Sequence, residues 1–279
     1  MSSRCHFGGW VGGLGLGVLA CGPPVASSRP PPPQAPSSES PSAGREPVAA
    51  SSEAPAIVSA HFSRSDDPEL DGQDGLLVVF SVELDAAAMH PRGFVVSRHD
   101  AGPVWPKRAI FAPASEDDEN RSILLVGDFG AAEHPPTHVA VSGSLYSESG
   151  VPLSGLGAPV VPFAAPPQVV AFEILPGGPG RCEGAAQVVR TYWSDELRGV
   201  GPEDLARVRV RTSAAEPAPP VRFDDHQTEH GEAGQDNVLD LCLAEAAPVV
   251  SVRVEAGAFR DVAGHQSAAI ELRVGDPGA

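Results

Sequence analysis

The second half of this 279-residue chain repeats the first half. The segment Phe80-Ser81-Val82-Glu83-Leu84 aligns with Trp193-Ser194-Asp195-Glu196-Leu197 at an offset of 113 residues. At the same offset, Val139, Val141, Leu145 and Tyr146 meet Val252, Val254, Ala258 and Phe259. In between, the offset becomes 111, which pairs Phe94 with Leu205, and then 117, which pairs Leu124 and Val126 with Leu241 and Leu243. Offsets that change while the order of matches is kept indicate retained elements joined by loops of different length.

Each copy consists of short runs that favour β-strands. The runs at 76–80, 93–97, 123–126 and 138–141 are rich in β-branched or alternating residues, and turn-forming residues separate them. The chain has 30 Gly and 30 Pro, and no stretch of twelve residues holds a convincing helical period. We therefore expect an all-β protein made of antiparallel β-sandwiches.

Two motifs resemble the bacterial Ig-like domain family that was first associated with surface-layer proteins. The first is the strand that ends in Phe80-Ser81, and the second is the turn Asp261-Val262-Ala263-Gly264-His265, where the family has Asp-x-x-Gly-Asn. The first copy reads Ser147-Glu148-Ser149-Gly150-Val151 at this turn and departs further from the family pattern. The resemblance implies two tandem Ig-like β-sandwiches, at 57–164 and 167–275. This fold serves mostly as a spacer or a binding platform.

The N-terminal residues have the pattern of an export signal. Arg4 precedes an uncharged run from Phe7 to Ala20, which is too short to span about 30 Å of hydrocarbon. The sequence Val18-Leu19-Ala20-Cys21 resembles the bacterial lipobox, which implies removal of residues 1–20 and lipidation of Cys21. Gly22 implies sorting to the outer membrane where there is one, and several acyl chains would give a stable anchor. An ordinary secretory signal with a chance cysteine is the alternative.

The segment that follows Cys21 is too polar and too simple in composition to form a core. From Gly22 to Ala56, 25 of 35 residues are Pro, Ser or Ala, and none is aromatic. Such a segment cannot bury enough apolar area to offset its chain entropy. We predict that residues 21–56 are a disordered tether.

Two of the four cysteines remain once the signal and the anchor are assigned. Cys5 would leave with the signal peptide and Cys21 would carry lipid, so that Cys182 and Cys242 are left in the second copy. Thiols within one small exported domain usually pair. We predict a disulfide, worth about 4 kcal/mol for a loop of roughly 60 residues, with two free thiols as the alternative.

Two acidic segments contain candidate metal ligands. His226-Gln227-Thr228-Glu229-His230 matches the inverted zinc-protease pattern, which requires a helix that the neighbouring prolines and glycines disfavour. We interpret 217–235 as a solvated acidic loop, in which Asp224, Asp225, His226 and His230 are candidate ligands for a divalent cation. The segment from Asp66 to Asp74 resembles a calcium loop, but Val78 stands where an EF-hand has a bidentate Glu. A charged turn is favoured there over a lone calcium site.

Other features bear on the class of function. Formal net charge is −17 and there is no block of basic residues, so nucleic acid is not an expected partner. No nucleophile motif is present, and His61, His99 and His138 are expected on exposed strand faces or loops.

These features predict an exported, lipid-anchored envelope protein without enzymatic activity or cofactor. It would contact the membrane through its lipid, and a protein or glycan through strand edges or loops, in a binding, adhesion or spacer role. One alternative is a periplasmic metal-binding protein or metal-dependent hydrolase that uses the loop 224–236. Another is a structural subunit of an envelope assembly.

Overall fold

The computed structural model describes residues 54–63, 70, 73–114, 118–130, 133–178, 181–224 and 237–276, and all of them belong to one compact unit. The predicted signal peptide, Cys21 and the predicted tether up to residue 53 lie outside the described residues. Asp225, His226, His230 and most of the segment from Asp66 to Asp74 also lie outside them. In the part of the chain that is described, no helix is long and apolar enough to cross a bilayer.

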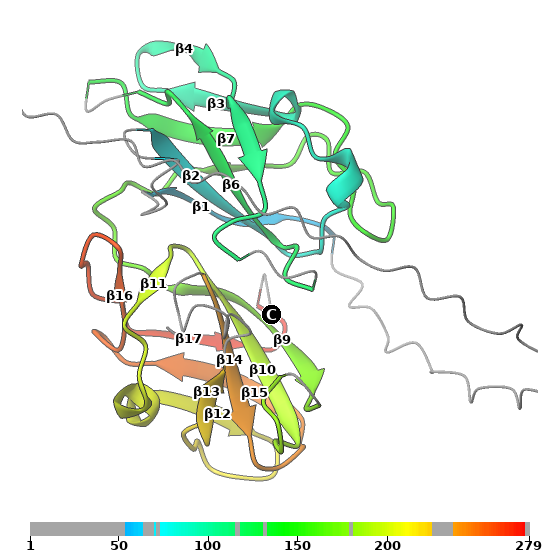
Figure 1. Ribbon diagram of the computed structural model, residues 1–279, viewed down its shortest axis with the longest axis vertical. Helices are drawn as coiled ribbons and strands as arrows, with labels where there is room; N and C mark the ends of the chain where they lie inside the picture. Colours follow the sequence, from blue (N-terminus) through cyan, green and yellow to red (C-terminus); the bar gives the residue numbers. More distant parts are fainter. Residues whose placement is uncertain are drawn as a thin grey trace, which may run out of the picture. The chain divides into compact units, whose positions relative to one another are not determined.

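The first half of the chain forms two antiparallel four-stranded sheets (Figure 1). One has the order β1-β2-β6-β5, with bounds Ile57–Ser63, Asp74–Phe80, Ser122–Gly127 and Arg108–Ile110. The other has the order β4-β3-β7-β8, with bounds Ala101–Val104, Phe94–Arg98, Pro136–Val141 and Gly157–Pro159. The short 3-10 helices η2 (Ala86–Ala88) and η3 (Pro91–Gly93) lie between β2 and β3. Alternate residues of β2, such as Val78 and Phe80, pack with Phe94 and Val139 of the other sheet in one core.

The second half repeats this arrangement. One sheet has the order β13-β14-β10-β9, with bounds Arg222–Asp224, Val238–Leu243, Gln187–Trp193 and Val169–Pro176. The facing sheet has the order β12-β15-β17, with bounds Val208–Thr212, Val249–Val254 and Ile270–Arg273. A small pair, β11 (Leu197–Arg198) with β16 (Arg260–Asp261), and the 3-10 helix η4 (Pro202–Arg207) complete it. Trp193 packs edge-on against Phe259, with ring centroids 5.1 Å apart, in the core of this half. The predicted all-β fold with β-sandwich domains is confirmed.

The serine of the Phe-Ser motif and its counterpart fix the chain that enters each sandwich. Ser81 Oγ accepts the backbone N–H of Ala56 at 2.9 Å, and the Ser81 N–H donates to the Ala56 carbonyl at 3.0 Å. Ser194 makes the same two bonds to Gln168, at 3.1 and 2.9 Å. Ala56, predicted as the last residue of the tether, is therefore bonded to the first sheet.

The two predicted hairpin turns have the same geometry despite their different sequences. Asp261 Oδ1 accepts the N–H of His265 at 2.8 Å, and Ser147 Oγ accepts the N–H of Val151 at 3.0 Å. Gly264 and Gly150 both have positive φ, at 88° and 81°, where a side chain would be strained. The Ser147 hydroxyl in the first copy thus accepts the same backbone hydrogen bond that the Asp261 carboxylate accepts in the second.

The predicted alignment of the two copies is wrong by one residue in β6. Pairing with the adjacent strands matches Leu125 with Leu241, an offset of 116, where the sequence alignment used 117. Leu125 and Leu241 both face a core, while Leu124 faces outward. Because side chains alternate between the faces of a strand, a slip of one residue exchanges the inner face for the outer one.

Two further matches are also corrected. Phe94 corresponds to Val208 rather than to Leu205. Phe94 and Val208 each start a strand directly after a 3-10 helix. They pair with Val141 and Val254, which are equivalent residues of β7 and β15. Leu145 corresponds to Phe259, since both accept the equivalent backbone bond after the hairpin turn, and Tyr146 is exposed. Similar residue types had favoured the wrong register.

Candidate functional site

The outer faces of β1, β2, β9 and β10 contribute residues to one apolar cluster between the two sandwiches. An apolar cluster joins Val79 and Ala114 of the first half to Val170, Ala171, Tyr192 and Val238 of the second half. Burial of these side chains removes apolar surface from water, which favours association of the two sandwiches. Polar groups surround this cluster, and they form the candidate site.

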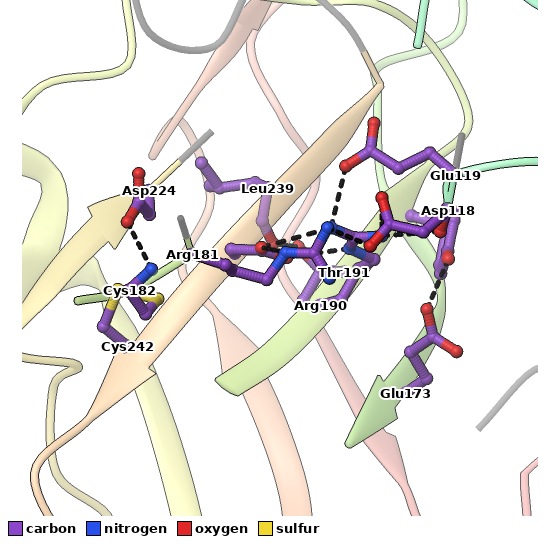
Figure 2. Close-up of polar contacts among 12 residues, drawn as sticks. Asp118, Glu119, Glu173, Arg181, Cys182, Arg190, Thr191, Asp224, Leu239 and Cys242 are labelled. Carbon is purple, nitrogen blue, oxygen red and sulfur yellow. Dashed lines mark hydrogen bonds and ion pairs between the residues drawn. A yellow bond between two sulfur atoms is a disulfide. The ribbon is translucent and has the colours of Figure 1, made fainter. Parts of the chain in front are cut away.

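Arg190 is the centre of the largest polar group (Figure 2). Its side chain lies in β10 and is fully buried. Nε and Nη2 donate to the two carboxylate oxygens of Asp240 on β14, at 2.9 and 3.3 Å. Nη1 donates to the backbone carbonyl of Asp118 at 2.8 Å, and Nη2 lies 2.9 Å from Glu119 Oε1. The guanidinium of the second sandwich is therefore bound by a loop of the first.

Arg181 adds a second cation to this group. Its Nε lies 2.9 Å from Asp240 Oδ2, and its Nη2 pairs with Asp118. Burial alone would raise the pKa of Asp118, but the hydrogen bond from Arg181 and the charges of Arg190 and Arg181 lower it below its ordinary value. Burial alone would lower the pKa of Arg190, but the hydrogen bond with Asp240 and the charges of Glu119 and Asp240 raise it. Two cations and three carboxylates thus form one connected network.

A second polar group lies on β9. Arg121 Nη2 is 2.7 Å from Glu173 Oε2, and Tyr192 O–H donates to Glu173 Oε1 at 2.6 Å. The Arg121 guanidinium also lies over the Tyr192 ring, 5.3 Å from its centroid. Burial and the charge of Glu173 raise the pKa of Tyr192 well above its ordinary value, so the phenol stays protonated and acts as a donor.

His61 was predicted on an exposed face, and this prediction is wrong. The side chain is fully buried in β1, with Nδ1 3.3 Å from Asp195 Oδ2. Asp195 also accepts from Ser63 O–H, and its own Oδ1 accepts the N–H of Glu196 at 2.9 Å. The second sandwich covers this face of β1. The residue pattern of the first module alone contains no sign of that cover. His99 and His138 are exposed, as predicted.

The two acidic residues before β6, Asp118 and Glu119, belong to this network rather than to a solvated loop. Glu119 is 2% exposed, and Asp118 binds Arg181 and Arg190. A detectable signal was the charge of Arg190 and Asp240 inside two otherwise apolar strands. The backbone pairs these two residues directly across β10 and β14.

The predicted disulfide between Cys182 and Cys242 is present, with a Cα–Cα distance of 5.4 Å. Asp224 Oδ2 accepts the N–H of Cys182 at 2.5 Å (Figure 2). The same oxygen lies 3.2 Å from Arg222 Nη2. The two sulfurs and the Asp224 carboxylate lie within 4.8 Å of one another. Because the sulfurs are joined to each other, they do not offer the thiolates that bind metal.

The other metal candidates are only partly described. Asp225, His226 and His230 lie outside the described residues, so the zinc and divalent-cation hypotheses remain predictions. Of the calcium candidate, Asp74 is described, and its Oδ2 accepts the N–H of Phe129 at 2.9 Å. This bond gives the Asp74 carboxylate a structural role at the start of β2.

The arrangement can join two modules, and its centre is closed to ligands. Arg190, Glu119 and Asp240 are at most 2% exposed, and they bind one another or the backbone. Separation of the two modules would leave these buried charges without partners, and this cost opposes separation. The chemistry of the site is therefore that of an interface.

No protein-family model matches the sequence, and no curated protein matches it. Among solved structures, the chain is similar to the S-layer protein rSbsC(31-844), at 13% identity and a TM-score of 0.29, over 78% of this chain and 25% of that chain. It is also similar to domains 1-6 of SbsC, at 14% identity and a TM-score of 0.29, over 80% and 26%. Bovine butyrophilin matches at 8% identity and a TM-score of 0.18, over 77% and 94%. The chain spans about a quarter of the length of these two S-layer chains.

Proposed function

We propose that this chain is an exported, lipid-anchored envelope protein in which two Ig-like modules, 57–164 and 167–275, form a stiff noncatalytic spacer or binding platform. The observation that carries the proposal is the burial of Arg190 of the second module against Asp118 and Glu119 of the first. A linker alone would leave the modules free to move. A buried, charged contact of this kind opposes their separation.

Spin-label distance measurements test the stiffness. Labels on exposed sites of β4 and β12 should give one narrow distance distribution in the wild type. Arg190→Gln should broaden it, whereas Arg209→Gln, which removes a charge on the other face of the second module, should not. A broad distribution in the wild type would refute the stiff spacer.

The anchor is supported by Val18-Leu19-Ala20 before Cys21 and is tested separately. Mass spectrometry of the native N-terminus should find Cys21 with diacylglyceryl and acyl groups. Cys21→Ala should release the protein from the membrane fraction, and Cys5→Ala should leave it there. An intact, unacylated Cys21 would overturn the anchor and the proposed envelope location with it.

A further inference from the structure

The outer face of the sheet β12-β15-β17 carries a hollow of about 520 Å³. Val208, Val210, Val252 and Val254 turn inward to the core of the second sandwich. The alternate residues of the same strands therefore turn outward. Four of these outward residues are arginines that line the hollow: Arg209, Arg211, Arg253 and Arg273.

The arginines come from three different strands, so they do not form a block of basic residues in the sequence. Arg209 lies directly opposite Arg253, and Ser251 lies between Arg211 and Arg273. Like charges directly opposite each other destabilise a strand pair. Four of the 19 basic residues of a chain with net charge −17 are thus gathered on one face.

Two of these four guanidinium groups make no polar contact with another described residue that would compete with a ligand. Arg273 lies 3.1 Å from Glu271, and Arg209 Nη1 donates to a backbone carbonyl at 3.2 Å. By contrast, no hydrogen bond or ion pair joins the side chain of Arg211 or Arg253 to any other described residue. Both side chains are exposed. An oxyanion between them would offset the positive charge of this face and accept hydrogen bonds from both planar groups.

The rest of the lining restricts the kind of anion. Glu216, Glu255 and Ser251 lie among the arginines. Carboxylates would repel a uniformly negative surface such as an anionic membrane or a nucleic acid, and they accept hydrogen bonds from hydroxyl groups. Pro217 is the only apolar residue of the lining, which lacks the aromatic or aliphatic anchors typical of protein interfaces. The volume lies within the usual range of about 300–1,000 Å³ for small-ligand sites.

We propose that this hollow binds an acidic saccharide, with its carboxylate between Arg211 and Arg253 and its hydroxyl groups on Glu216, Glu255 and Ser251. This inference goes beyond the spacer role and does not depend on it, because binding is measured on the purified chain wherever the protein resides.

Calorimetric titration with trigalacturonate tests the site. The wild type should bind trigalacturonate and should not bind maltotriose, a neutral trisaccharide of equal length. Arg211→Gln with Arg253→Gln should weaken binding about tenfold or more, because two charge-assisted contacts are lost. The matched control is Arg92→Gln with Arg108→Gln, which removes two exposed arginines of the first half and should change the affinity less than about twofold.

Backbone NMR gives a second measurement that does not rely on variants. Amide shifts on addition of trigalacturonate should be confined to β12, β15, β17 and the neighbouring lining residues Glu216, Pro217 and Glu255. Absence of binding, equal weakening in both double variants, or shifts spread over both sandwiches would overturn the site. Equally tight binding of triglutamate would show that charge alone is recognised, and would overturn the saccharide assignment.

Discussion

Equivalent places in the two sandwiches are filled by opposite chemistry. On the outer face of the first, Leu77 pairs with Leu124 across β2 and β6. On the outer face of the second, Arg190 pairs with Asp240 across β10 and β14. The same backbone therefore supports an apolar pair in one copy and a buried ion pair in the other.

The loop before the second strand shows the same contrast. In the first copy, Leu70 packs on Leu124 and Val126 in a small apolar cluster. In the second copy, Cys182 is bonded to Cys242, which occupies the place of Val126. One loop is held by hydrophobic contact and the other by a covalent bond.

This difference shows which of the two kinds of contact can hold the two sandwiches together. Leu77 and Leu124 are complete within their own sandwich, since apolar contacts require no further partners. Arg190 pairs with Asp240 within its own sandwich, but it also bonds the Asp118 carbonyl and the Glu119 carboxylate of the other sandwich. A buried ion pair therefore makes the second module depend on the first, which an apolar pair would not do.

The largest expected effect follows from removing the charge at the centre of this contrast. Arg190→Leu copies Leu77 at the equivalent place, but it leaves the buried carboxylates of Asp240 and Glu119 without this guanidinium. We expect the free energy of unfolding to fall by about 5 kcal/mol, the upper end for a broken buried pair. Urea unfolding followed by circular dichroism measures the change.

The matched variant is Arg190→Leu with Asp240→Leu, which reproduces the Leu77–Leu124 pair in full. It should recover more than half of the loss, because only Glu119 then keeps a buried charge that faced Arg190, and Arg181, which loses Asp240, still pairs with Asp118. A loss below about 1 kcal/mol in the single variant would contradict the role given to this ion network.

The next effect concerns the covalent closure. Cys182→Ala with Cys242→Val places the valine of the first copy in the second, and removes a crosslink between residues 60 apart. We expect unfolding to become easier by about 4 kcal/mol, on the chain-entropy estimate. Denaturant unfolding with and without a reductant measures this. The reductant should destabilise the wild type and leave the variant unchanged, and a wild type that ignores reduction would show that the bond adds no stability.

The apolar contact of Leu70 in the first copy should contribute less to stability than the disulfide of the second. Leu70→Ala removes a side chain that is 5% exposed and packs on Leu124 and Val126. We expect a loss of about 2–3 kcal/mol, at the lower end for a buried leucine, because the cluster lies at the edge of the sandwich. Val274→Ala, at an exposed position, is the control and should cost almost nothing. An equal loss in both variants would mean that Leu70 does not hold its loop.

Short β-branched or alternating runs separated by turn-forming residues were enough to predict the sandwich architecture, and matched segments at similar offsets predicted the repeat. The disulfide followed from the number of cysteines left in an exported domain. Leu124 was misaligned because both faces of β6 are buried, which removes the alternation that fixes register. His61 was misplaced for a related reason, because the second module covers it and the residue pattern of the first module contains no sign of that cover. Nothing in the sequence pattern predicted the burial of Glu119 either. The four arginines of the hollow were not predicted as a group, because only the pairing of β12, β15 and β17 brings them together.

The smallest effect concerns a glutamate that both copies retain. Glu196 is buried beside Arg198, whereas its counterpart Glu83 lies beside Glu148. Burial, the hydrogen bond with Glu148 and the charge of Glu173 raise the pKa of Glu83 from its ordinary value of 4.5 to about 7, against the lowering effect of Arg121. The folded state thus favours the protonated carboxyl. Its contribution to stability is complete below pH 4.5 and is lost as the pH rises through about 7.

Glu83→Gln should remove this pH dependence, because the amide keeps the hydrogen-bonding shape of the protonated acid. Relative to the wild type, we expect the variant to be more stable at pH 8 by on the order of 1–2 kcal/mol, and unchanged at pH 4, after allowance for solvent screening. Asp118, with its lowered pKa, acts in the opposite direction and loses its contribution as the pH falls, so the difference between variant and wild type is the quantity to measure. Glu196→Gln should instead destabilise the protein at pH 8, because it breaks an attractive pair. If both variants shifted stability in the same direction, the two glutamates would not be in opposite environments, and the contrast between the copies would fail at this position.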